Sequence, residues 1–480
     1  MADVSAADPP AGERYALAAN NELRLEVPPG RAATIRLASG SAEVFGAEMA
    51  PGRPYSVGGT NAAVFTWHGC EVDVDADDGG GGLDVVYVSD ETGPNVACVN
   101  THAQLEAMRD DALAAAGAAA AAGGGGGGDG APPPPPKEGP RVLLAGPADC
   151  GKSSLARTLA AYAVKLGRSP LLVDVDPSQN ALSVPGTMAA APMRAESVDV
   201  VTHLSSGYSI AGGTAPLVLW YGSSDVAANP ELYRAQLDQL GRDLDGRMEG
   251  DADARADGFL VNTSGHIEDE GYKCLLHAVD ALRINVVLVV GHDRLYSMLT
   301  TFFKRRTRAD GPIPKIIKLP RSGGVVSRGA AHRRSCRADA VRQYFNGGKV
   351  RLPEGKAVNQ YTPFLMEVDF ADLTIKKLSG LSLTSSMLPV AAKQSTDPVQ
   401  LEPLTVGPTL RHALLAVCHP QAVKSYVESG NASDLYLSGM AGFVAVEKVD
   451  MEREVLSLLC PSAGTLPSMT LLCGEIEANF

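Results

Sequence analysis

A glycine-rich stretch, GPADCGKSS, spans residues 146–154 and fits the phosphate-loop pattern G-x-x-x-x-G-K-[ST]. Glycine lets the backbone approach a ligand closely, so successive N–H groups of the loop can point at the β- and γ-phosphates of a nucleotide. Lys152 adds a positive charge at the γ-phosphate, and Ser153 is the expected Mg²⁺ ligand. The stretch therefore predicts a purine nucleoside triphosphate site. Its expected ligands are Gly146, Asp149, Cys150, Gly151, Lys152, Ser153 and Ser154.

The identity of the nucleotide and of the phosphate acceptor is less closely specified. No [NT]-K-x-D pattern, which is usual in guanine-binding proteins, follows the loop, and this absence favours ATP. The loop by itself leaves an ATPase switch, a kinase and a GTPase open.

Two carboxylates, Asp174 and Asp176, end the next predicted strand in the segment DVDPSQ. Side chains two residues apart in a strand share a face, and ligands of open α/β sheets bind at the carboxyl ends of the strands. Phosphoryl transfer to an alcohol needs a group that accepts or orients the hydroxyl proton. We therefore expect this role for Asp176 and metal support from Asp174. The alternative is that one of the two only caps the following turn.

A basic segment lies further along the chain, between Lys304 and Arg342. It holds twelve Lys and Arg residues and two Asp, a local charge of +10, whereas the whole chain has a formal net charge of −13. The acidic total argues against non-specific coating of nucleic acid, which needs concentrated positive charge. The segment predicts a polyanion site, with a solvated basic surface as the alternative.

The phosphate loop requires a strand before it and a helix after it. Residues 141–144 predict that strand, a helix follows to about Leu166, and a second strand covers 170–175. The continuous apolar runs at 258–262 and 284–290 are typical of parallel strands covered on both faces. The sequence therefore predicts an α/β domain with a parallel sheet.

Strand-like runs flank this domain on both sides. Short alternating runs between Glu22 and Ser89 predict a small β-sandwich or barrel, and similar runs from Tyr361 onward predict a β-rich third domain. Thr101 and Gln104 form a capping-box pattern, from which we expect a connecting helix to begin. The predicted divisions are a disordered segment 1–12, an N-terminal β domain 13–99, a helix and Gly/Pro-rich linker 100–140, a P-loop ATP-binding domain 141–348 and a C-terminal β-rich domain 349–480.

The remaining composition indicates an intracellular protein without membrane contact. The chain has no run of eighteen apolar residues and no export signal at its start. Its eight cysteines contain no C-x-x-C pair, which argues against a zinc site and a disulfide framework. We expect them to be reduced and mostly buried.

Several segments, taken in order, resemble the polynucleotide 5′-hydroxyl kinases, and within them the Clp-type subunit of the pre-mRNA 3′-end cleavage factor. The likeness covers nearly the whole chain. The segments that carry it are ELRLEV (22–27), GSAEVFGAEM (40–49), VFTWHGC (64–70), GPADCGKSS (146–154), YAVKLGRSP (162–170), DVDPSQ (174–179), VPGTM (184–188), NTSGH (262–266) and LPRSGGVVSRGAAHRRSCRADAVRQYF (319–345).

The resemblance implies a RecA-like P-loop core between an N-terminal β-sandwich and a C-terminal β-rich domain. ATP would lie between the core and the N-terminal domain, in contact with Glu22 and Asn61, although close relatives usually have a basic residue at the latter position. Without the resemblance, Glu22 would be read as an exposed strand carboxylate. Arg328, Arg333 and Arg337 match a lid that closes over the phosphates, where such groups can contribute roughly 10³ to 10⁵ in rate.

The resemblance also indicates a substrate site. Ser224 and Asn229 fall where relatives contact RNA. Active relatives have a tryptophan after N-T-x-G, which stacks on the terminal base, but this chain has His266. Stacking on an aromatic ring contributes about 1 to 3 kcal/mol per base, and imidazole is smaller than indole. The alternative is that His266 is an ordinary polar loop residue.

Two functions are therefore predicted side by side. The first is a kinase for 5′-hydroxyl RNA or DNA ends, and the second is a silent scaffold that keeps ATP as a structural ligand. A small-molecule kinase is a third alternative. The resemblance implies three partners, namely RNA with a 5′-hydroxyl end, the large cleavage-factor subunit that reads the polymerase tail, and the tRNA splicing endonuclease. It also implies a nuclear location.

Overall fold

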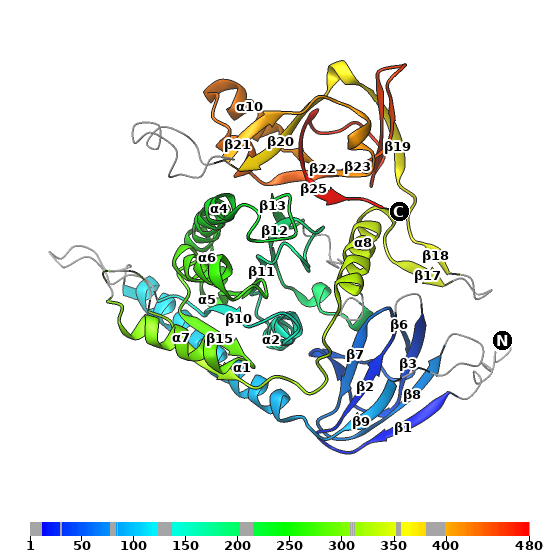
Figure 1. The fold of residues 1–480 in the computed structure, drawn as a ribbon. Coiled ribbons are helices and arrows are strands. Elements are labelled where there is room, and N and C mark those ends of the chain that lie inside the picture. Colours follow the sequence, from blue (N-terminus) through cyan, green and yellow to red (C-terminus); the bar gives the residue numbers. More distant parts are fainter. Residues whose placement is uncertain are drawn as a thin grey trace.

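The computed structural model describes residues 12–28, 31–76, 83, 85–122, 137–201, 215–307, 309, 311, 313–351, 357–380 and 399–479. The chain forms an N-terminal β domain, a central α/β core and a C-terminal β domain, with the core between the other two (Figure 1). The predicted disordered segment 1–12, apart from Gly12, and residues 123–136 of the predicted Gly/Pro-rich linker lie outside the described residues. None of the described helices is long and apolar enough to cross a membrane.

The N-terminal domain is a sandwich of two antiparallel sheets, as the alternating runs predict. Strand Ala32–Gly40 illustrates the cause, because it buries Ala33, Ile35 and Leu37 on one face against the second sheet. The first sheet has the order β1 (Glu13–Leu17), β8 (Cys70–Ala76), β3 (Ala32–Gly40), β6 (Pro54–Gly58). The second has the order β5 (Ala47–Glu48), β4 (Glu43–Val44), β7 (Asn61–Phe65), β2 (Glu22–Glu26), β9 (Val85–Ser89).

The connecting helix α1 (Gly93–Ala122) begins well before Thr101, so the predicted capping box is wrong. The Thr101 hydroxyl instead donates to the Ala97 carbonyl 2.8 Å away, inside the helix. Arg109 on α1 is buried, and its Nε donates to the carbonyl oxygen of Asp257 over 2.9 Å. This part of the predicted linker is therefore docked on the core.

The core contains a seven-stranded sheet that is mixed rather than wholly parallel. Its order is β13 (Leu217–Trp220), β12 (Thr187–Pro192), β11 (Leu171–Asp174), β14 (Phe259–Asn262), β10 (Arg141–Ala145), β15 (Val286–Val290), β16 (Lys315–Leu319). Strands β11, β14, β10, β15 and β16, which are consecutive in this order, run parallel to one another. Strand β12 is antiparallel to both of its neighbours, β11 and β13. Because β14 lies between β10 and β11, the residues that end these three strands are neighbours.

Helices cover the core sheet and one forms the lid. They are α2 (Lys152–Lys165), α4 (Pro230–Gly250), α5 (Ala252–Asp257), α6 (Asp269–Ala281), α7 (Asp293–Lys304) and α8 (Ala330–Asn346). We call residues 321–346, which include α8, the lid. Short 3₁₀ turns lie at Ala195–Ser197, Phe370–Asp372 and Pro408–Leu410.

The C-terminal domain is a second seven-stranded sheet, which packs on the core. Its order is β19 (Phe364–Asp369), β24 (Val455–Cys460), β23 (Met440–Asp450), β22 (Ala413–Cys418), β25 (Thr470–Glu477), β20 (Thr374–Gly380), β21 (Val399–Pro403). Helices α10 (Pro420–Ser429) and α11 (Ser433–Tyr436) accompany it, and β17 (Lys349–Arg351) pairs with β18 (Ala357–Asn359). Trp220 of the core meets Phe443 of this domain with ring centroids 5.4 Å apart. All eight cysteines are unpaired, and all but Cys336 are buried, as expected.

Candidate active site

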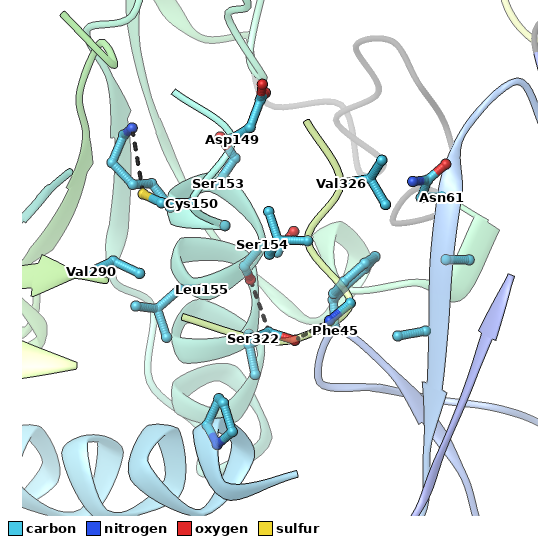
Figure 2. A pocket seen from close by; sticks show the side chains of 18 of the residues that line it. Phe45, Asn61, Asp149, Cys150, Ser153, Ser154, Leu155, Val290, Ser322 and Val326 are labelled. Atoms are coloured by element: carbon cyan, nitrogen blue, oxygen red, sulfur yellow. Dashed lines mark hydrogen bonds between the residues drawn. The ribbon is translucent and has the colours of Figure 1, made fainter. Parts of the chain in front are cut away.

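A cavity of about 490 Å³ lies where the N-terminal domain, the phosphate loop and the lid meet. Its size is within the range of small-molecule sites. Figure 2 shows Ser153 and Ser154 at the start of α2 on one side, Asn61 of β7 on the other, and Val326 of the lid between them. The predicted residues that line the cavity are Glu22, Asn61, Asp149, Cys150, Gly151, Lys152, Ser153, Ser154, Asp176, Ser224, Arg328, Arg333 and Arg337.

The phosphate loop is shaped by two glycines. A Cβ at Gly146 would lie 2.9 Å from the carbonyl oxygen of Val290, so only glycine fits against the next strand. Gly151 has φ 92°, in the left-handed region that favours glycine, immediately before α2 begins. The ammonium of Lys152 folds back into the loop and donates to the carbonyl oxygens of Gly146 and Pro147, each 2.8 Å away. An incoming phosphate therefore competes with the loop for this charge.

Ser153 is held by a buried relay that sequence reasoning missed. Its Oγ lies 3.4 Å from Oδ1 of Asn262, whose Nδ2 donates to Oδ1 of Asp174 over 3.1 Å. Asn262 could have been found from the sequence, because it ends the predicted strand 258–262 and ligands bind at the carboxyl ends of such strands. The relay places a neutral amide beside the expected Mg²⁺ ligand.

Asp174 does not line the cavity, contrary to the expectation that both carboxylates reach it. It is fully buried, and its oxygens also accept from the N–H groups of Asp176 and Ala181, 3.0 and 2.9 Å away. The reason is that β11 ends at Asp174 and the chain then turns back over its side chain. Burial, and then the charge of Asp176, raise the pKa of Asp174 to about 7. The structure thus places Asp174 behind Asn262 rather than at the phosphates.

Asp176 does line the cavity. Its Oδ1 accepts from the backbone N–H and the hydroxyl of Ser178, 3.0 and 2.7 Å away. Among the described residues, none donates a hydrogen bond to Oδ2. One oxygen is therefore fixed and the other is available to a ligand.

The lid is tied to the phosphate loop through the carboxylate of Asp149. Its Oδ2 accepts from Nη2 of Arg333 over 2.6 Å and from the backbone N–H of Arg328 over 2.9 Å. Burial alone would raise the pKa of Asp149, but the two donors and the arginine charges outweigh burial and hold the pKa below its ordinary value. The lid arginines are therefore drawn to the phosphate end of the cavity by a residue of the loop itself.

The N-terminal domain closes the opposite wall. Glu22 is buried and accepts from Nε of Arg24 over 2.5 Å, so its interpretation as an exposed strand carboxylate is wrong. Phe45, which the sequence did not single out, lines the same cavity and has a left-handed backbone with φ 46°. A flat aromatic ring in this wall is suited to stack on a nucleobase.

Two of the three expected RNA contacts lie outside the cavity. Ser224 lines it, but Asn229 caps α4, with its Oδ1 accepting from the N–H of Leu232 over 3.2 Å. The side chain of His266 is 41% exposed, and its Nδ1 lies 3.8 Å from Oδ1 of Asp225. His266 does not line the cavity, whereas the preceding residue, Gly265, does. Within the described ranges, no group of three or more His, Cys, Asp or Glu side chains could hold a metal ion.

Comparison with known proteins identifies the family of this chain. Residues 146–347 match the family model described as the P-loop of mRNA cleavage and polyadenylation factor CLP1. Residues 16–112 match the N-terminal β-sandwich domain of polyadenylation factor, and residues 361–478 match the pre-mRNA cleavage complex II protein Clp1. The chain belongs to the Clp1 family. The predicted resemblance and the predicted three-domain architecture are thereby confirmed, and the family's P-loop implies that the chain binds ATP.

Relatives in the Clp1 family align over nearly the whole chain. The polyribonucleotide 5′-hydroxyl-kinase Clp1 of Danio rerio is 34% identical over 97% of this chain and 94% of its own length. The Homo sapiens protein of the same name is 32% identical over 97% of this chain and 96% of its own length. A solved structure of wild-type Clp1p in complex with Pcf11p shares the fold, with a TM-score of 0.75 and 24% identity over 97% of both chains.

Proposed function

We propose that the protein is a polynucleotide 5′-hydroxyl kinase of the mRNA 3′-end cleavage and polyadenylation machinery, which uses ATP and Mg²⁺. Its relatives in Danio rerio and Homo sapiens carry the name of this activity. The observation that carries the proposal is the meeting of Lys152, Asp176 and the three lid arginines around one cavity.

In the proposed reaction, the 5′-hydroxyl oxygen bonds to the γ-phosphorus of ATP as the bond from that phosphorus to the β,γ-bridging oxygen breaks. Oδ2 of Asp176, which accepts no hydrogen bond from the described residues, is placed to orient the hydroxyl and receive its proton. Lys152 leaves the loop carbonyls to meet the phosphates. Arg328, Arg333 and Arg337 stabilise the negative charge that spreads over the transferred group.

Mg²⁺ would neutralise part of the charge on the β- and γ-phosphates. Ser153 would hold it together with the phosphate oxygens, because its hydroxyl faces the cavity and its orientation is fixed by Asn262. We assign Asp174 the support of Asn262 in this arrangement. Glu22, Asn61 and Phe45 would contact the nucleoside of ATP on the wall formed by the N-terminal domain.

The proposal extends to RNA, partners and location. Ser224 would contact the 5′ end of the RNA, whereas Asn229 and His266 could do so only after the loops that carry them move. A structural neighbour is a complex of Clp1p with Pcf11p, which supports the large cleavage-factor subunit as a partner. The tRNA splicing endonuclease remains a second proposed partner. A role in mRNA processing supports the proposed nuclear location.

The alternative is an ATP-bound scaffold without turnover. Two observations favour it, namely Asn61 at a position where close relatives usually have a basic residue and the position of His266 outside the cavity. Both functions need ATP, so only a measurement of phosphoryl transfer separates them.

Transfer of labelled γ-phosphate from ATP to an oligoribonucleotide with a 5′-hydroxyl end tests the kinase. We expect transfer by the wild-type protein and loss of at least about a hundredfold in rate with Asp176→Asn, because proton transfer by a positioned group contributes about 10² to 10⁴. Asp253→Asn on the exposed surface of α5 is the matched control. Absence of transfer by protein that still holds ATP would leave the scaffold as the function.

His266→Trp tests the proposed stacking position. If the position can meet the terminal base, the larger ring should lower the KM for the oligonucleotide by about fivefold or more, since stacking contributes about 1 to 3 kcal/mol. An unchanged KM would mean that His266 is an ordinary loop residue, and the KM for ATP serves as the internal control.

A further inference from the structure

A second, smaller cavity of about 150 Å³ adjoins the nucleotide cavity. Three segments surround it, namely the start of β7, α8 of the lid and the loop that follows β11, and α2 forms its floor. The two cavities share Phe45, Asn61, Ser153, Ser154, Gln179, Arg328 and Arg337. Its volume equals roughly five water molecules at about 30 Å³ each, which is the size of a small oxyanion rather than of a nucleoside.

The charged residues that line this second cavity are all positive within the described parts of the chain. They are Arg157, Arg328 and Arg337, and no described aspartate or glutamate lines the cavity. Across the described parts of the chain, none of these three guanidinium groups forms a hydrogen bond or an ion pair with the protein. Arg157 projects from the second turn of α2 and is partly buried. Like charges gathered in a partly dehydrated cavity repel one another unless an anion lies between them.

The electrostatic environment of Arg157 agrees with this requirement. Burial lowers the pKa of its guanidinium, the charge of Asp174 opposes that shift, and the charge of Arg328 adds to it. Asp174 itself is occupied by the relay to Asn262 and does not line the second cavity. The described residues therefore supply no counter-ion inside the cavity.

A neutral donor in the same cavity also lacks a partner. Gln179 lines both cavities, and its side-chain Nε2 is buried without a hydrogen bond. A buried donor of this kind costs about 1 to 3 kcal/mol unless a ligand satisfies it. Three guanidinium groups and one amide donor, all without acceptors, fit the oxygens of a phosphate.

The position of the second cavity indicates which phosphate it takes. Gln179 and Ala181, which line it, belong to the loop that carries Asp176. Val290 and Ser322 line the nucleotide cavity but not the second one, so the second cavity does not reach the end of β15 or the start of the lid. The second cavity therefore adjoins the loop that carries the proposed proton acceptor, Asp176.

We propose that the second cavity is a phosphate subsite for the acceptor, and that it binds the phosphodiester that follows the 5′-terminal nucleoside. The inference rests on the proposed function and adds Arg157 and Gln179 to the residues that contact the substrate. It explains in chemical terms how the site would prefer a polynucleotide to a free nucleoside, since only the former carries this phosphate.

Kinetics with two minimal acceptors test the subsite in the full-length protein. We expect adenosine 3′-phosphate to have a KM at least about tenfold below that of adenosine, because it can occupy the cavity. Arg157→Met should remove most of this difference by raising the KM of adenosine 3′-phosphate about tenfold. The KM values for adenosine and for ATP should stay within a factor of two. Arg157→Lys, which keeps the charge, should recover part of the preference.

Arg294→Met is the matched control, because Arg294 is 77% exposed on α7 and lines neither cavity. Thermal unfolding of each variant shows whether the fold is kept. A preference that Arg157→Met leaves intact would overturn the subsite. An equal rise in the KM for ATP would also overturn it, because Arg157 would then act on the nucleotide.

A measurement of dinucleotide binding distinguishes a failure of the proposed subsite from a failure of the proposed kinase function. If the wild-type protein transfers no phosphate, fluorescence anisotropy of a labelled 5′-hydroxyl dinucleotide still reports occupancy of the cavity. Binding that weakens about tenfold in both Arg157→Met and Gln179→Ala, but not in Arg294→Met, supports the subsite in a protein without turnover. Equal binding by all of these proteins would refute it.

Discussion

Within the phosphate loop, two charged side chains are held by internal contacts that a nucleotide must replace. Lys152 donates to two carbonyl oxygens of its own loop, and Asp149 accepts from the lid. Asp149 brings Arg333 to the loop before any phosphate is present. The nucleotide then exchanges one set of charge contacts for another, which lowers the net cost of ordering the lid.

The contact of Asp149 with the lid can be tested by Asp149→Asn. The pair is partly exposed, with side-chain exposures of 15% for Asp149 and 35% for Arg333, so we expect a loss of at most about 1 kcal/mol. Amide hydrogen exchange in residues 330–346 should become up to about fivefold faster without nucleotide. Asp339→Asn, which removes a carboxylate paired with Arg342 inside α8, should leave exchange near the loop unchanged. Equal exchange in both variants would contradict the assignment.

The contribution of Asp149 to stability has a defined pH dependence. Because its folded pKa lies below the ordinary value, the contribution is present at neutral pH. It is lost as the pH falls through the folded pKa, below about 4. Asp149→Asn should therefore lower the free energy of unfolding at pH 7, and the difference from the wild-type protein should shrink as the pH falls below about 4.

Asp174 should show the opposite dependence. Its pKa is raised to about 7, so its protonated form favours folding, and stability falls as the pH rises from about 4 to about 7. The slope from this one group is at most about 1.4 kcal/mol per pH unit. Denaturant unfolding at a series of pH values should show that Asp174→Asn lacks this slope. A variant with the same slope as the wild-type protein would show that Asp174 is ionised throughout.

The phosphate loop could be predicted from sequence because its ligands lie within nine consecutive residues. The relay from Ser153 through Asn262 to Asp174 could not, because it depends on which strand pairs with which. Strand β14 lies between β10 and β11 although it follows both in sequence, and only this order brings the three side chains together. Arg157 and Gln179 were missed for the same reason, since their cavity exists only after three segments meet.

Among the elements, β25 of the C-terminal domain supports the loop that carries Ser224. The backbone N–H of Glu475 donates to the Gly222 carbonyl over 2.6 Å, and its carboxylate accepts from the hydroxyl of Ser223 over 2.9 Å. The third domain therefore fixes one edge of the proposed substrate entrance without lining the cavity itself.

Glu475→Ala tests this support. Loss of one partly buried hydrogen bond costs about 1 kcal/mol, so we expect the KM for a 5′-hydroxyl oligonucleotide to rise about threefold to fivefold while the KM for ATP is unchanged. Glu477→Ala, on the same strand and exposed, is the control. A change in the KM for ATP alone would show that β25 acts on the nucleotide side instead.

The elements also show where local patterns mislead. The Thr101 and Gln104 spacing fits a capping box equally well inside a helix, and α1 starts instead at Gly93, with Pro94 in its first turn. The buried apolar strands were predicted well because parallel strands need continuous apolar runs. The antiparallel β12 was not predicted, because its direction depends on its pairing with β11 and β13.

For the whole molecule, the nucleotide cavity exists only while the N-terminal domain is docked on the core. The hydroxyl of Tyr162 on α2 donates to Glu43 of the N-terminal domain, and Lys165 pairs with the same carboxylate at 3.3 Å. Burial, and then the charge of Glu43, raise the pKa of Tyr162, so its proton stays in place to make this contact.

Tyr162→Phe leaves the buried Glu43 with one donor fewer, which costs about 1.5 to 3 kcal/mol. We expect a lower Tm and weaker binding of a fluorescent ATP analogue by about tenfold, because domain docking and the cavity are the same equilibrium. Tyr272→Phe on α6 is the control, since its hydroxyl makes no hydrogen bond in the described parts of the chain. Loss of Tm without loss of nucleotide affinity would contradict the coupling.

The docking of α1 has a consequence for how such chains can change over time. Asp111 of α1 forms an ion pair with Lys137 at 2.7 Å. The chain after residue 136 therefore begins in contact with α1, the helix that Arg109 holds on the core. Doubling the length of a connecting segment costs only about 0.6 kcal/mol of closure entropy. This stretch is therefore a place where repeated glycine and proline codons can expand or contract between generations, or where a reporter protein can be inserted, without displacing any wall of the ATP cavity.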